Sequence, residues 1–265
     1  MFTILPIKGF IDQIDGFNCD GIHAGLKPNG NNDLGFIYTN KPCNVQAIFT
    51  DNKFQAAPLK HFLQYGENFQ TNFVLINSKN ANALTGRKGI EDINTLFSQL
   101  DFDLINPIMS STGVIGNPLP IEKIVESAKS FDLNASSGEN LSKAIMTTDA
   151  YEKNCMYEVK LENGSSFKIG AVAKGAGMIN PNLATMLCFI CTDANVPKED
   201  MKELLEINSH TTFNAISVDG DTSTNDTVML LANGKSNTYD KVAFQEALRL
   251  VMHDMAMLMV ADGER

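Results

Sequence analysis

The sequence of 265 residues has no tryptophan, only four histidines and only five cysteines. The histidines show no metal-ligand spacing, so we expect no bound metal. The cysteines are too few and too scattered for a disulfide framework, which predicts reduced thiols. Cys188 and Cys191 have the spacing of a redox motif, but they lie within an apolar run that precedes no helix start. A packed strand is therefore the better interpretation of that pair.

Basic residues are also scarce, since 21 Lys and Arg face 31 Asp and Glu for a net charge of −10. This balance lacks the positive field that binding of nucleic acid or of an anionic membrane requires, and it favours a small-molecule substrate. We identify no run of 18 apolar residues, and the first eight residues lack the features of a signal peptide. We therefore expect a cytoplasmic globular protein of one large domain or two lobes.

The hydrophobic pattern predicts a mixture of strands and helices. The expected strands cover residues 35–38, 45–49, 72–76, 156–161, 167–172, 185–191 and 226–231. The expected helices cover residues 90–100, 120–130, 196–208 and 241–260. The turn Asn163-Gly164 predicts a hairpin. Because hairpins replace a regular alternation of strand and helix, the pattern favours an α+β fold over a doubly wound sheet.

The segment from Lys174 to Ile190 carries the strongest sign of chemistry. Thr185 directly follows Ala184. The residues before it contain two glycines and a proline, which predict a tight, irregular backbone, and the residues after it form an apolar run. A hydroxyl held there can attack the preceding carbonyl, so that the Ala184-Thr185 bond shifts to oxygen and hydrolyses. The freed α-amino group of Thr185 can then act as a base for its own hydroxyl. From the residues alone, a threonine that merely enters a strand is the simpler alternative.

Residues 173–187, Ala-Lys-Gly-Ala-Gly-Met-Ile-Asn-Pro-Asn-Leu-Ala-Thr-Met-Leu, resemble the processing segment of the ornithine acetyltransferase family, also called bifunctional glutamate N-acetyltransferases of arginine biosynthesis. Further segments resemble family signatures in the same order, at residues 21–26, 80–86, 111–116, 144–149 and 216–226. The resemblance covers essentially the whole chain. Family members continue beyond the Asp-Gly-Glu at residues 262–264, so we expect that this chain lacks roughly the last third of the pattern. We also expect it to be weak or inactive as a transferase and prone to hydrolyse its ester.

The resemblance implies a layered αββα sandwich that cleaves itself between Ala184 and Thr185. The pieces, residues 1–184 and 185–265, would form an α2β2 heterotetramer. The implied reaction moves an acetyl group from N-acetylornithine to glutamate through an acetyl ester on Thr185. It needs no cofactor, although acetyl-CoA would be a second acetyl donor in a bifunctional member.

The resemblance also assigns roles to individual residues. Thr112 and Gly113 become the oxyanion hole, because a hydroxyl and a close backbone approach supply donors to a developing negative charge. Without the resemblance, a simple turn is the better interpretation of these two residues. Lys174 would hold a substrate carboxylate, and Thr147 and Glu264 would be further substrate contacts.

Two other functions stay open at the level of sequence. One is an amino-terminal-nucleophile peptidase or amidase, in which water takes the acyl group. The other is an inactive remnant, in which the apolar stripe of residues 241–260 would be exposed. Residues 219–226 could suggest a calcium loop, but the twelfth position is Leu230 rather than a glutamate, which favours an acidic connecting loop.

Overall fold

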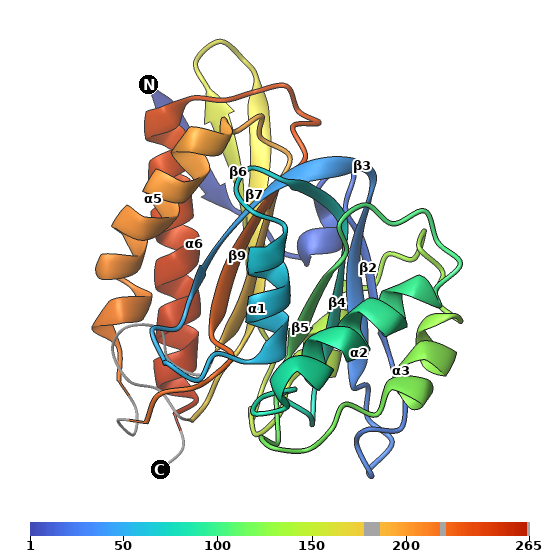
Figure 1. Ribbon diagram of the computed structural model, residues 1–265. Helices are drawn as coiled ribbons and strands as arrows, with labels where there is room; N and C mark the ends of the chain where they lie inside the picture. The colour runs from blue at the N-terminus through green and yellow to red at the C-terminus, as the bar shows by residue number, and fades with distance from the viewer. Residues whose placement is uncertain (178–185, 218–220, 264–265) are drawn as a thin grey trace.

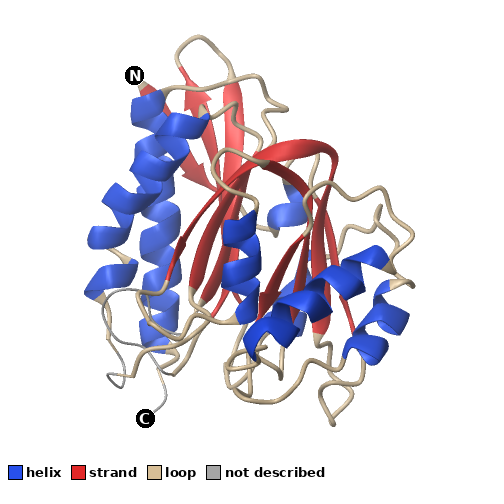
Figure 2. Cartoon of the chain, viewed as in Figure 1, coloured by secondary structure: helices blue, strands red, loops and turns tan. Residues whose placement is uncertain are grey.

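The computed structural model describes residues 1–177, 186–217 and 221–263. These residues form a nine-stranded sheet with helices packed on it (Figures 1 and 2). The strands are β1 (Phe2–Pro6), β2 (Asn18–Ile22), β3 (Leu34–Phe49), β4 (Gln70–Asn77), β5 (Ile108–Ser111), β6 (Lys153–Leu161), β7 (Ser166–Lys174), β8 (Leu187–Thr192) and β9 (Thr227–Ala232). The helices are α1 (Ala57–Gln64), α2 (Gly86–Ser98), α3 (Ile121–Ala128), α4 (Gly138–Ile145), α5 (Lys198–His210) and α6 (Lys241–Ala261).

The sheet folds into two layers at the long strand β3. Its strand order is β1-β6-β7-β8-β9-β3-β4-β5, and β2 also pairs with β3. Residues 34–38 of β3 pair with β2 and β4, whereas residues 44–49 pair with β9, and the register shifts between Tyr38 and Cys43. The strands expected at residues 35–38 and 45–49 are therefore one strand that passes from one layer to the other.

Three hydrophobic cores lie between four layers. One core packs α5 and α6 against the outer faces of β6 to β9. A second core lies between the two sheet layers, where Phe189 and Met229 meet Ile37 and Val74. In the third core, α2 and α3 cover the outer faces of β3 and β4, as Figure 1 shows on the opposite side of the molecule from α5 and α6. The order helix, sheet, sheet, helix confirms the expected α+β sandwich.

Most of the elements expected from the sequence are present. The four expected helices correspond to α2, α3, α5 and α6, and the expected hairpin is β6 with β7. Cys188 and Cys191 are buried on opposite faces of β8, one in the α5–α6 core and one between the sheet layers. Their thiols cannot form a redox pair within this strand, so the interpretation as a packed strand is confirmed.

The topology brings several strand ends to one place. β7 runs antiparallel to β8, so that Lys174 at the end of β7 pairs with Leu187 at the start of β8. β8 is parallel to β9, and Leu187 pairs there with Thr227. The end of β7 and the starts of β8 and β9 therefore lie at the same edge, which is where the candidate site is built. Among the described residues, no helix is long and apolar enough to cross a membrane.

Candidate active site

Thr112 and Gly113 form a tight turn after β5. The amide of Thr112 donates to the carbonyl of Asn77 at 3.0 Å, so the backbone of the turn is fixed to the end of β4. Gly113 has φ of 134°, and a Cβ at this position would lie 2.3 Å from the carbonyl carbon of Lys79. Only glycine fits this close approach. Because the amide of Thr112 is already bonded, its hydroxyl is the donor that the residue can offer to a ligand.

Lys174 and Thr112 are in contact. Both side chains are buried, and Lys174 Nζ donates to Thr112 Oγ1 at 3.3 Å. A hydroxyl that accepts from an ammonium group still has its own hydrogen to donate. Two residues that the sequence analysis selected, 62 positions apart, thus meet at the edge where β7 ends and β8 begins.

Asp149 connects the segments that carry Thr147 and Lys174. Its carboxylate accepts the amide of Thr147 at 2.9 Å and the amide of Gly175 at 2.7 Å. It also accepts from Lys153 Nζ at 2.9 Å. Burial raises the pKa of Asp149, but the ammonium groups of Lys174 and Lys153 outweigh burial and hold this pKa below its usual range. The carboxylate is therefore ionised, and both of its oxygens accept hydrogen bonds within the protein.

Lys153 extends this network to the end of α6. Its side chain is fully buried between Asp149 and Asp262, with which it forms two ion pairs. Asp262 also accepts the amide of Ala150 at 3.0 Å. The buried charges of Asp149, Lys153 and Asp262 thereby join Thr147, Lys174 and the segment that leads to residue 264. The roles of Lys153 and Asp262 could not be predicted from the sequence, because each residue alone has the appearance of a solvated charge.

Asp226 is a third residue of the site that the sequence does not predict. It lies directly before β9, fully buried, and its Oδ1 accepts the amide of Met186 at 3.0 Å. Among the described residues, its Oδ2 has no hydrogen-bond partner. Burial raises the pKa of Asp226 well above the usual range of a carboxyl group. Asp226 therefore fixes the backbone at the residue after Thr185, and the charged form of its carboxyl group is disfavoured.

This raised pKa predicts a specific dependence of stability on pH. A carboxyl group with a higher pKa in the folded than in the unfolded state binds its proton more tightly when folded. The free energy of unfolding should therefore decline as pH rises from about 4, the usual pKa of aspartate, through the folded-state pKa. Asp226→Asn keeps an oxygen that can accept from Met186 and should remove this decline. Urea unfolding of both proteins from pH 4 to pH 8 tests it, and identical slopes would contradict the assignment.

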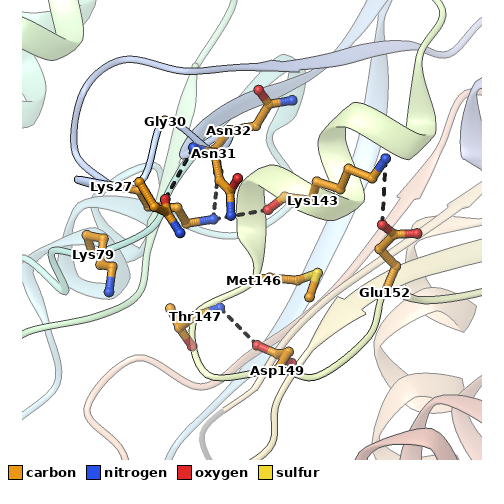
Figure 3. Close-up of a pocket in the computed structure, with 11 residues that line it drawn as sticks. Lys27, Gly30, Asn31, Asn32, Lys79, Lys143, Met146, Thr147, Asp149 and Glu152 are labelled. Atoms are coloured by element: carbon orange, nitrogen blue, oxygen red, sulfur yellow. Dashed lines mark hydrogen bonds and ion pairs between the residues drawn. The ribbon is translucent and has the colours of Figure 1, made fainter.

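A cavity of about 550 Å³ opens beside Asp149 (Figure 3). Its volume is in the range of pockets that bind small molecules. It contains Thr147, one of the predicted substrate contacts, and both positive and negative side chains. The charged residues that line it are Lys27, Lys79, Lys143, Asp149 and Glu152. A pocket with both signs of charge suits a zwitterionic ligand.

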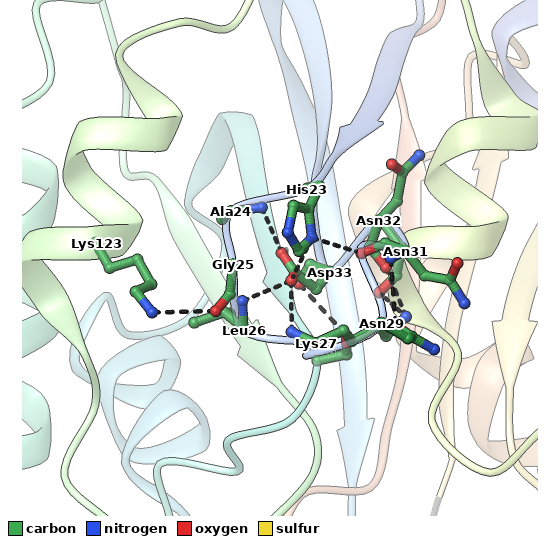
Figure 4. Close-up of polar contacts among 12 residues, drawn as sticks. His23, Ala24, Gly25, Leu26, Lys27, Asn29, Asn31, Asn32, Asp33 and Lys123 are labelled. Atoms are coloured by element: carbon green, nitrogen blue, oxygen red, sulfur yellow. Dashed lines mark hydrogen bonds and ion pairs between the residues drawn. The ribbon is translucent and has the colours of Figure 1, made fainter.

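The loop of residues 23–33 forms one side of this cavity (Figure 4). Buried Asp33 organises it by accepting the amides of Ala24, Leu26 and Lys27 at 2.6 to 2.7 Å. Lys27 is consequently turned inward, where its Nζ donates to the carbonyl of Asn32 at 2.6 Å. Burial, with the positive charges of Lys79 and Lys174, lowers the pKa of Lys27 to about 8. This lowered pKa is mainly an effect of burial, and the negative charge of Asp33 opposes it.

The structure brings together three of the predicted site residues and places Gly113 beside them. Thr112 contacts Lys174, and Asp149 links Lys174 to Thr147 through the amide of Gly175. The predicted nucleophile Thr185, the cleavage-site residue Ala184 and the substrate contact Glu264 lie outside the described residues. Their roles stay predictions.

The fold is that of the solved ArgJ and ornithine acetyltransferase structures. The sequence profile of the ArgJ family matches residues 18–265, and the chain belongs to this family of arginine-biosynthesis enzymes. It is 55% identical over 267 residues to the arginine biosynthesis bifunctional protein ArgJ of Wolinella succinogenes, covering 100% of this chain and 67% of that protein. It is 40% identical to the ArgJ protein of Listeria monocytogenes, covering 97% of this chain and again 67% of the relative.

Two solved structures are similar to this chain. The ArgJ protein of Bacillus halodurans superposes with a TM-score of 0.63 at 33% identity, over 70% of this chain and 99% of that one. The ornithine acetyltransferase of Mycobacterium tuberculosis, solved in complex with ornithine, gives a TM-score of 0.56 at 25% identity, over 70% of this chain and 100% of that one. The chain spans about two thirds of the length of the curated relatives.

Proposed function

We propose that this protein is a glutamate N-acetyltransferase that takes the acetyl group from N-acetylornithine and carries it as an ester on Thr185. The contact between Lys174 and Thr112 is the observation that carries this proposal. It places a buried cation, able to bind a substrate carboxylate, next to a hydroxyl that can donate to a developing oxyanion. The ornithine bound to the Mycobacterium tuberculosis relative supports amino-acid substrates.

The first half-reaction transfers the acetyl group to the enzyme. The α-amino group of Thr185 takes the proton of its own hydroxyl, and Oγ attacks the acetyl carbonyl carbon of N-acetylornithine. Thr112 and the amide of Gly113 donate to the carbonyl oxygen as it becomes negative. The amide nitrogen then leaves with a proton as ornithine. In the second half-reaction, the α-amine of glutamate attacks the ester carbon and releases Thr185.

Self-cleavage would give pieces of 184 and 81 residues. The second piece contains β8 and β9, which lie in the sheet between β7 and β3 of the first piece. The two pieces would therefore stay associated through the sheet and its cores. The size of the solved Bacillus halodurans chain supports this division, since 70% of 265 residues is about 186 and nearly all of that chain is matched.

Two further properties belong to this proposal. The names of the bacterial relatives describe them as bifunctional, which supports acetyl-CoA as a second acetyl donor. The two pieces assemble as an α2β2 heterotetramer, which native mass spectrometry would measure. A complex with one copy of each piece would contradict that assembly.

The ester on Thr185 provides the test of function. Incubation with N-acetylornithine alone should add one acetyl group to the 81-residue piece, and glutamate should then remove it, as intact-mass spectrometry would show. Thr185→Ala should remain one uncleaved chain and gain no acetyl group. An enzyme that passes the acetyl group to water at the same rate with and without glutamate would instead be an amidase, and a wild-type protein that never acquires the acetyl group would refute the proposal.

A further inference from the structure

We propose that the cavity beside Asp149 binds the distal groups of both amino-acid substrates, with Lys79 holding the distal carboxylate of the acceptor and Glu152 the distal ammonium of the donor. This inference rests on the proposed function. Glutamate and ornithine share an α-carboxylate and an α-nitrogen but end in groups of opposite charge. A single site that serves both half-reactions therefore needs a partner for each charge.

The other charged side chains of the cavity are already engaged. Lys27 Nζ donates to the carbonyls of Asn32, Lys143 and Ala144 at 2.6, 3.1 and 3.4 Å, which uses its three hydrogens. The carboxylate of Asp149 accepts two amides and Lys153. Lys27 therefore has no donor left for a ligand, and Asp149 has at most one acceptor position left, on Oδ2.

Lys79 is the cation of the cavity whose ammonium group is able to donate hydrogen bonds to a ligand. Among the described residues, none forms a hydrogen bond or ion pair with its ammonium group. Its backbone is tied to the oxyanion turn, because its carbonyl accepts the amide of Val114 at 3.1 Å and lies against Gly113. The side chain of Lys79 thus starts beside Gly113 and lines the cavity (Figure 3).

The backbone conformation of Lys79 supports a role in binding. Its φ is 71°, in the left-handed region that favours glycine and asparagine. A lysine in this region costs stability, and such strain is concentrated at functional sites. Burial of the Lys79 side chain does not offset this cost in stability, because the side chain is exposed. A lysine at this strained position is consistent with a benefit to ligand binding rather than to folding.

Glu152 supplies the opposite charge at the other side of the cavity. Figure 3 shows Thr147 and Asp149 between Lys79 and Glu152. Glu152 lies 3.9 Å from Lys143 Nζ, which is a loose contact because Lys143 forms a much closer pair with Glu139 at 2.5 Å. The carboxylate of Glu152 therefore keeps most of its capacity to bind an ammonium group.

The test measures the two half-reactions separately in otherwise native protein. Lys79→Met should raise the KM for glutamate about tenfold or more, since a charge-assisted hydrogen bond is lost, and leave the KM for N-acetylornithine within about twofold. Glu152→Gln should do the reverse. Lys79→Arg should retain most glutamate binding. Lys129→Met and Glu126→Gln, which change exposed residues of the α3 region outside the cavity, are the matched controls.

A second variant of Lys79 separates an effect on substrate binding from an effect on the stability of the fold. Lys79→Gly removes the side chain and also the strain, so it should raise the melting temperature by a few degrees while raising the KM for glutamate. A lower melting temperature for Lys79→Gly would show that the lysine serves the fold.

The outcomes distinguish a failure of the shared subsite from a failure of the proposed acetyltransferase function. If wild-type protein forms the acetyl ester but the Lys79 and Glu152 variants change both KM values equally, or neither, the shared subsite is wrong and the proposed function stands. If wild-type protein forms no ester, the proposed function itself fails.

Discussion

Replacing Lys153 with methionine should cost about 3 to 5 kcal/mol in the free energy of unfolding. The change leaves the carboxylates of Asp149 and Asp262 buried without the cation that both contact. Removal of one partner from a buried ion pair is costly because the remaining charge has lost both its partner and its water. Urea unfolding at neutral pH measures the effect.

The network should also affect substrate binding. Asp149 holds the amides of Thr147 and Gly175, so a shift of Asp149 moves two predicted substrate segments together. At temperatures where Lys153→Met stays folded, we expect weaker binding of both amino acids. Lys129→Met, at an exposed position, should change stability by less than about 0.5 kcal/mol. A loss of under 1 kcal/mol for Lys153→Met would show that the buried charges are far less coupled than their geometry implies.

The sequence predicts the longer elements of this fold well and the short ones poorly. The long helices α5 and α6 have apolar residues at helical spacing over three turns or more, so the period is clear. By contrast, α1 and α4 have eight residues each, and their sequences show no clear period. The helix α3 has the same length, and the sequence predicts it with Pro120 at its start. Helices of this length are stabilised by the surfaces on which they pack, and those surfaces come from distant parts of the chain.

The continuity of β3 could not be predicted for a related reason. Its apolar pattern is interrupted around Asn40 and Lys41, and such polar residues usually mark a loop. In the fold they lie where the strand passes between the two sheet layers and its pairing with β4 shifts register. A local pattern cannot distinguish a turn from a strand that changes layers.

The site residues also divide into those that local sequence motifs predict and those that only the fold brings together. Thr112 and Lys174 belong to contiguous motifs, which a sequence shows directly. Lys153 and Asp262 are 109 positions apart, and only the packing of α6 against β6 and β7 brings them together. Asp226 has a weak local signal, since a carboxyl group directly before an apolar strand is expected to need a buried partner. Its partner, the amide of Met186, could be found only from the pairing of β8 with β9.

Replacing Thr112 with valine should lower kcat for acetyl transfer about 100-fold or more, with a much smaller change in KM. Valine keeps the shape of threonine but removes the hydroxyl that is positioned beside Lys174. A donor that acts on developing charge stabilises the transition state more than the bound substrate, so its loss is expressed in kcat. Thr112→Ser retains the donor and should keep most of the activity. Steady-state kinetics of the three proteins, with their melting temperatures, measures the effect.

Thr192→Val is the matched control for this change. Thr192 is buried in β8 and donates to the carbonyl of Lys168 at 2.7 Å, away from the site. Its replacement should therefore reduce stability through a lost hydrogen bond and leave kcat nearly unchanged in the folded protein. Self-cleavage should also slow in Thr112→Val but not in Thr192→Val, because cleavage develops an oxyanion at the carbonyl of Ala184. If Thr112→Val keeps wild-type turnover, or loses activity only in proportion to its stability as Thr192→Val does, the hydroxyl is part of a structural turn and the oxyanion hole must lie elsewhere.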